Sequence, residues 1–119
     1  MKVRAIRGAT TVASDDKTEI TKSVVELLSE IFSSNGLNQS DLISILFTAT
    51  PDLTSHFPAT AARELGLSDT PLICATELDI KDGLPRCIRV LVSAYSNLEK
   101  AEIKHIYLRD AVMLRKDIS

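Results

Sequence analysis

The sequence predicts one α/β domain (α+β) in which a long helix covers one face of a mixed sheet of about five strands. Three observations support this fold class. Five short apolar segments are separated by turn residues, and only one stretch repeats apolar side chains at helical spacing over about five turns. No linker, repeat or low-complexity tract divides residues 1–119, so a single domain is expected. A chain of this length can bury a core without disulfides or a metal.

The first predicted strand spans residues 2–12. Side chains alternate across a strand, so Arg7 lies on one face with Val3, Ala5 and Ala9. A guanidinium among small apolar side chains either reaches solvent at the end of the sheet or meets a ligand. Both interpretations of Arg7 stay open at this point.

The next element is a helix. Ser14, Asp15 and Asp16 can cap its start, and Asn35-Gly36 can end it. Its apolar face is formed by Ile20, Val24, Leu27, Leu28 and Ile31. One helix covers only one face of a sheet, so the other face must be buried elsewhere. Oligomerisation is the simplest way to bury it.

The rest of the chain alternates strands with one short helix. A strand over 42–49 ends at Thr50-Pro51-Asp52, because proline disfavours helix before it and cannot donate to a ladder. Pro58 opens the short helix and Gly66 ends it. Further strands are predicted over 71–76, 86–95 and 104–110.

Composition excludes several functions. A net charge of -2 argues against general binding of nucleic acid or of anionic membranes. The two cysteines, Cys74 and Cys87, lie in apolar runs without metal-ligand spacing, which is typical of reduced core thiols in the cytoplasm. No apolar run resembles a signal peptide or reaches membrane-spanning length. A soluble cytoplasmic domain is therefore expected.

The motifs of common catalytic sites are absent from the sequence. There is no glycine-rich phosphate loop, no metal-ligand cluster and no Gly-x-Ser-x-Gly elbow. His56 and His105 stand alone, and each is expected to be structural rather than a base or a ligand. The chemistry must therefore come from the remaining charged side chains.

Two opposite charges lie in neighbouring apolar segments. Glu77 follows the run 71–75, and Arg89 interrupts the run 87–92. Ionised groups are rarely buried without a partner, because desolvation costs several kcal/mol per ion. The two side chains form either a structural ion pair or a site that holds a polar ligand between them. Arginine suits bidentate recognition of carboxylate or phosphate, so the second interpretation implies a small anion held by charge and orientation.

Four segments carry a resemblance to a known family. RAIRGATTV, TATPDLTSHFPATAARELG, CATELDIKDGLPRCIRV and HIYLRDAVMLR, in this order, resemble the AroH-class monofunctional chorismate mutases. The resemblance implies a homotrimer that forms a pseudo-α/β barrel. It also implies a Claisen rearrangement of chorismate to prephenate in clefts between subunits, for aromatic amino acid biosynthesis (the shikimate pathway), without metal or cofactor.

The resemblance also implies a role for individual residues. Arg89 would donate to the ether oxygen and to a substrate carboxylate, Glu77 would meet the ring hydroxyl, and Arg7 and Tyr107 would hold the other carboxylate. The remaining implied contacts are the Cys74 backbone at the ring hydroxyl, Phe57, Ala59 and Leu114 along the cleft, and Arg63 and Arg115 at its mouth. Position 60, where the family often carries a lysine, is Thr60 here.

Two other functions are alternatives to a chorismate mutase. An imine/enamine deaminase of similar trimeric fold would not account for the combined Glu77 and Arg89 segments. A non-catalytic trimer that binds a small acid would need the arginines but not Glu77. The carboxylate therefore favours the mutase.

Overall fold

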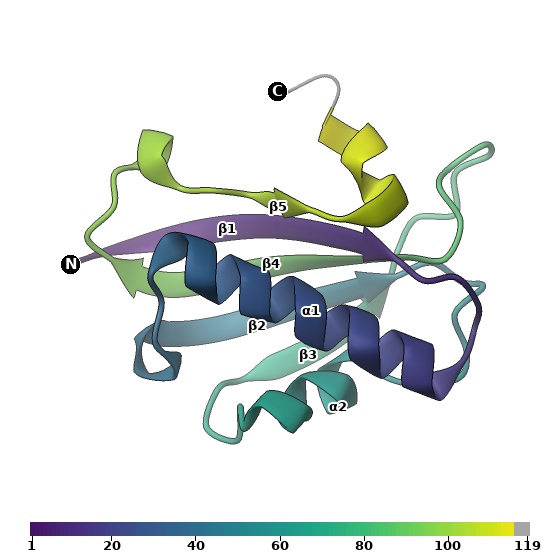
Figure 1. Ribbon diagram of the computed structural model, residues 1–119, viewed down its shortest axis with the longest axis horizontal. Helices are drawn as coiled ribbons and strands as arrows, with labels where there is room; N and C mark the ends of the chain where they lie inside the picture. The colour runs from purple at the N-terminus through teal and green to yellow at the C-terminus, as the bar shows by residue number, and fades with distance from the viewer. Residues whose placement is uncertain (116–119) are drawn as a thin grey trace.

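The computed structural model describes residues 1–115, without the side chain of Arg115. Within this part, five strands form one sheet in the order β3-β2-β4-β1-β5 (Figure 1). The strands are β1 (Lys2–Thr11), β2 (Leu42–Ala49), β3 (Leu72–Thr76), β4 (Cys87–Ser96) and β5 (Ile106–Tyr107), and the helices are α1 (Lys17–Asn35) and α2 (Pro58–Ala62). The central pairs β1–β4 and β2–β4 are antiparallel, whereas the edge pairs β2–β3 and β1–β5 are parallel. The predicted mixed sheet with one long and one short helix is confirmed.

Helix α1 begins and ends where its sequence provides caps. The Asp16 side chain accepts from the Glu19 backbone N–H at 3.1 Å, and Gly36 adopts the left-handed conformation with φ of 62°. Just before that end, Asn35 bonds both the carbonyl (2.9 Å) and the N–H (2.8 Å) of Lys104. These bonds fix the end of the helix to the segment that leads into β5.

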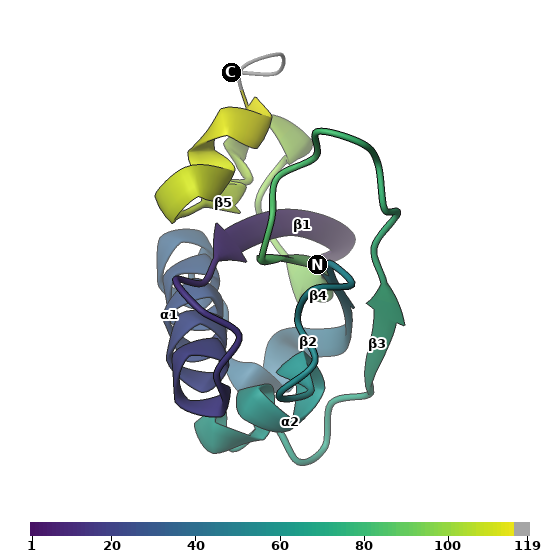
Figure 2. The same cartoon turned by 90° about the vertical axis from the view of Figure 1, so that its right-hand side faces the viewer.

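The two faces of the sheet differ in burial. Ile6, Ile45, Phe47, Ile88 and Val92 are buried with the predicted apolar face of α1. Seen from the side, α1 lies against one face, and no helix of the described residues lies on the other (Figure 2). Strand alternation places large exposed apolar side chains on that open face: Val3, Leu46, Ile73, Leu91 and Tyr95. The open face thus carries several exposed apolar side chains that no described helix covers in one copy of the chain.

The predicted last strand over 104–110 is wrong in extent. Strand β5 contains only Ile106 and Tyr107, and a 3-10 helix, η4 (Arg109–Arg115), follows it. The strand ends because Arg109 has a positive φ of 53°, which an extended strand cannot accommodate. Its guanidinium then lies 3.6 Å from Glu26 on α1.

Candidate active site

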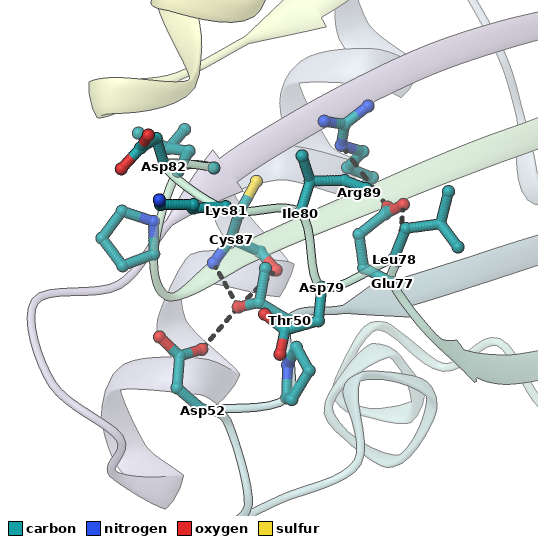
Figure 3. Close-up of a pocket in the computed structure, with 14 residues that line it drawn as sticks. Thr50, Asp52, Glu77, Leu78, Asp79, Ile80, Lys81, Asp82, Cys87 and Arg89 are labelled. Carbon is teal, nitrogen blue, oxygen red and sulfur yellow. Dashed lines mark hydrogen bonds and ion pairs between the residues drawn. The ribbon is translucent and has the colours of Figure 1, made fainter.

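Glu77 and Arg89 meet on the open face of the sheet. Arg89 Nε lies 3.5 Å from Glu77 Oε2, and the two side chains are 49% and 23% exposed (Figure 3). The backbone N–H of Glu77 donates to the carbonyl of Ala49 at 2.9 Å, just beyond the end of β3. Arg89 lies on β4, paired with Thr48 of β2 and with Ala9 of β1. The predicted partnership of the two charges is therefore present in the structure.

A loop over 77–86 forms one wall of a cavity beside this pair. The cavity has a volume of about 720 Å³ and is lined by residues 77–85 of the loop together with Thr50, Asp52, Cys87 and Arg89 (Figure 3). The loop is tied down where it enters β4. Asp52 accepts from the Arg86 backbone N–H at 2.9 Å, and Thr50 Oγ1 accepts from the Cys87 N–H at 2.9 Å. Burial raises the pKa of the Cys87 thiol, so this sulfur stays protonated at neutral pH.

A second cavity lies on the other side of Arg89. It has a volume of about 370 Å³, and its wall contains Arg7, Arg89, Tyr107 and Leu114. The parallel pairing of β5 with β1 places Tyr107 beside Ala9, two residues along the strand from Arg7. Four residues that the sequence singled out thus line one cavity: Arg7, Arg89, Tyr107 and Leu114. Glu77 lies next to this cavity because it pairs with Arg89.

His105 has a structural contact at this edge. Its Nδ1 accepts a hydrogen bond from the Arg7 backbone N–H at 2.9 Å. This bond holds the segment before β5 against β1. It agrees with the expectation that His105 is structural.

The other predicted site residues form a separate group near α2. Phe57 and Cys74 line a third cavity of about 630 Å³, and the Phe57 ring is 69% exposed. Ala59 is nearly buried, and its backbone N–H lies 3.4 Å from Cys74 Sγ. Arg63 is exposed in the 3-10 turn after α2. None of these residues lines the two cavities that share Arg89, and the side chain of Arg115 lies outside the described residues.

Asp15 holds the loop that presents Phe57. The Asp15 carboxylate accepts from the backbone N–H groups of Thr54 and Ser55, both at 3.0 Å, and from the Thr54 hydroxyl at 2.8 Å. These bonds, above all the one from the Thr54 hydroxyl, lower the pKa of Asp15. The sequence suggested Asp15 as part of the helix cap, but Asp16 makes the cap and Asp15 binds this loop instead.

Thr48 is a further residue at this site that the sequence did not predict. Its hydroxyl donates to Glu77 Oε2 at 2.7 Å, a shorter contact than the one from Arg89. Alternation along 42–49 could have placed Thr48 on a face with Leu46. Its position beside Glu77 and Arg89 depends on the register of three strands, which no local pattern shows.

The described residues contain neither a metal-binding cluster nor a membrane-spanning helix. No group of three or more histidine, cysteine or acidic side chains in residues 1–115 is arranged to hold a metal ion. No described helix has the length and apolarity needed to cross a bilayer.

The fold and the site together define a class of protein. Two arginines and a tyrosine beside one carboxylate, fixed on strands of an α+β domain, can bind an anion and stabilise charge that develops on it. Such a site suits an enzyme that orients its substrate electrostatically.

Comparisons with known proteins identify the family. The family model described as chorismate mutase type I matches residues 3–118. The chain is 42% identical over 120 residues to chorismate mutase AroH of Bacillus subtilis (strain 168), covering 100% of this chain and 94% of that protein. It is 43% identical over 117 residues to chorismate mutase AroH of Thermus thermophilus, covering 98% and 96%. The solved structure of a chorismate mutase from Clostridium thermocellum superimposes with a TM-score of 0.91 at 44% identity, covering 92% of this chain and 98% of that one.

The chain therefore belongs to the chorismate mutase type I family. The family predicted from the four sequence segments is confirmed. Membership supports a chorismate mutase activity, which is an isomerisation, and the place of the chain in aromatic amino acid biosynthesis.

Proposed function

We propose that this chain converts chorismate to prephenate in clefts that neighbouring copies of a homotrimer complete. The observation that carries the proposal is the position of Arg89. It lies between Glu77 on one side and the wall formed by Arg7 and Tyr107 on the other, within one chain. Family membership supplies the reaction, and this geometry supplies the groups that would perform it.

The charges of the site match those of the reaction. Chorismate is a dicarboxylate, and its C–O bond breaks ahead of C–C bond formation. Negative charge then develops on the ether oxygen and positive charge on the ring. The Arg89 guanidinium can donate to that oxygen, and Glu77 can face the ring and its hydroxyl. Groups fixed in advance where charge develops stabilise the transition state without covalent chemistry.

The carboxylates would be held by the other side chains of the same wall. Arg7 is exposed, and Tyr107 and Leu114 line the cavity beside it. The Arg7 guanidinium and the Tyr107 phenol line the same cavity as Arg89, so they can bind the second carboxylate of the substrate. Arg89 and Glu77 form a partly exposed ion pair, which is a weak interaction that a substrate can replace.

Trimer formation would complete the cleft. The open face of the sheet carries large exposed apolar side chains, and soluble monomers rarely expose such a surface. Phe57, Ala59, Cys74 and Arg63 lie apart from the Arg89 wall in one chain, so they would serve a cleft shared with a neighbour. The two free cysteines fit a reducing compartment, and we place the enzyme in the cytoplasm.

The first experiment follows the loss of chorismate absorbance with purified protein and no added metal or cofactor. We expect Arg89→Ala to lower kcat by on the order of 10²–10³, the usual effect of deleting one such donor. Arg89→Lys should also be poor, because a point charge does not reproduce the planar fork. Lys22→Ala, which removes an exposed positive charge from α1, is the matched control. Chorismate that binds but persists would point to a small-acid-binding protein instead.

A second experiment tests the shared cleft. Arg89→Ala and Phe57→Ala chains are purified separately, then mixed, unfolded and refolded together. If a cleft takes Arg89 from one copy and Phe57 from the next, each mixed trimer contains a cleft with both halves intact. Activity above that of either variant alone is therefore expected. A mixture no more active than its components, or a monomeric mass by gel filtration and light scattering, would contradict the shared cleft.

A further inference from the structure

The Glu77 carboxylate has three contacts with protein donors. Oε2 accepts from the Thr48 hydroxyl at 2.7 Å and lies 3.5 Å from Arg89 Nε, while Oε1 lies 3.2 Å from the Leu78 backbone N–H. The bond from Thr48 is the shortest of the three. The Thr48 hydroxyl, rather than the Arg89 guanidinium, is therefore the closest donor to this carboxylate.

The sheet explains why the hydroxyl lies there. Ile45 and Phe47 are buried under α1, so Leu46 and Thr48 point to the open face. Thr48 pairs with Arg89 on the β4 side and with Ala75 on the β3 side. Its strand thus lies between the strand that carries Arg89 and the one that Glu77 follows. A β-branched side chain has few rotamers in a strand, so the donor is held in place.

We propose that Thr48 is a positioning residue, whose hydroxyl keeps the Glu77 carboxylate aimed at the bound substrate. The proposal rests on the proposed function, in which Arg89 leaves Glu77 to bind the substrate. The partly exposed ion pair between Arg89 and Glu77 is then lost, but the hydrogen bond from the Thr48 hydroxyl to Glu77 does not depend on that pair. The Glu77 carboxylate therefore stays in position while it stabilises the positive charge that develops on the ring.

The test compares Thr48→Val, which keeps the shape and removes the donor, with Thr48→Ser, which keeps the donor. We expect Thr48→Val to lower kcat by about 10-fold to 100-fold with little change in KM, because a hydrogen bond to a charged group is lost and a small misplacement is costly. Thr48→Ser should recover most of this loss. Ser44→Ala, which removes a hydroxyl from β2 four residues earlier, is the control and should stay within about 2-fold of the unaltered enzyme.

A double variant separates positioning from a general structural effect. If Thr48 acts through Glu77, adding Thr48→Val to Glu77→Gln should lower kcat little further. Full additivity, or a Thr48→Val enzyme with unaltered kcat, would overturn the proposal. Circular dichroism and gel filtration check that each variant is folded and assembled.

Crystal structures give a readout that does not require activity. Glu77 should occupy one rotamer in the unaltered protein and in Thr48→Ser, and several in Thr48→Val. If Glu77 had the same single rotamer in Thr48→Val as in the unaltered protein, Thr48 would not be what positions Glu77. A chain with no chorismate turnover would instead refute the proposed function, while these structures would still decide the role of Thr48.

Discussion

Replacing Gly8 by alanine should strain the contact between β1 and α1. A Cβ at this position would lie 2.7 Å from Ile31 Cδ1, 3.1 Å from Val90 Cγ2 and 3.3 Å from the Ile106 carbonyl oxygen. Carbon atoms pack best at roughly 3.5–4.0 Å, so Ile31 must move by about 1 Å while Val90 and the β5 backbone restrict other adjustments. Overpacking of this kind costs about 1–3 kcal/mol.

A second substitution tests whether the contact with Ile31 causes the loss of stability in Gly8→Ala. Ile31→Val removes the atom in closest conflict and by itself costs about 0.5–1.5 kcal/mol. In the Gly8→Ala/Ile31→Val double variant the clash is relieved. We therefore expect it to be more stable than the sum of the two single effects predicts, with a coupling of about 1 kcal/mol.

Urea unfolding at one fixed protein concentration measures these differences, since assembly makes apparent stability depend on concentration. If the changes in unfolding free energy of Gly8→Ala and Ile31→Val add to within about 0.5 kcal/mol in the double variant, the alanine and Ile31 do not compete for space. A Gly8→Ala protein more stable than the unaltered one would refute the reasoning outright. In that case the alanine would stabilise the protein only by lowering the conformational entropy of the unfolded chain.

Three further predictions concern individual side chains. Hydrogen bonds hold the pKa of Asp15 below its ordinary value of 3.8, so they stabilise the fold above that pH and the benefit is lost as pH falls through the lower folded value. Asp15→Asn should thus lower stability near neutral pH, with a difference that shrinks below about pH 4. Asp69→Asn, at an exposed position, is the control and should change stability near neutral pH little. Thr60→Lys should change KM modestly with kcat little altered, because the exposed position 60 would act on substrate approach; a large kcat effect would place it at the reacting atoms. Cys87, buried and with a raised pKa, should resist iodoacetamide in the native protein and react in denaturant; rapid native labelling would contradict its burial.

Local patterns predicted most of the fold because they follow from short-range physics. The spacing of apolar residues and the caps at Asp16 and Gly36 define α1, and Pro58 and Gly66 bound the short helical segment. The strand predicted over 104–110 extends beyond Tyr107, where β5 ends. Its apolar alternation continues past the point where Arg109 takes a positive φ, and sequence alternation does not reveal a backbone dihedral.

The candidate site was predictable only in part. Charges within apolar runs pointed to Glu77 and Arg89, and the structure brings them together at 3.5 Å. Thr48 was missed because its role depends on strand register. The separation of Phe57, whose cavity β3 lines, from Tyr107 on β5 depends on the order of the strands, since topology places β3 and β5 at opposite edges of the sheet.

The parallel pairing of β5 with β1 joins segments made at very different times during synthesis. The Arg7 N–H bonds to a side chain 98 residues further along the chain, and Tyr107 arrives on the same segment. A chain interrupted between Arg89 and Ile106 contains both Glu77 and Arg89, but it leaves this edge of β1 unpaired and lacks the Tyr107 wall of the cavity beside Arg89. Such a product exposes a strand edge that is open to aggregation.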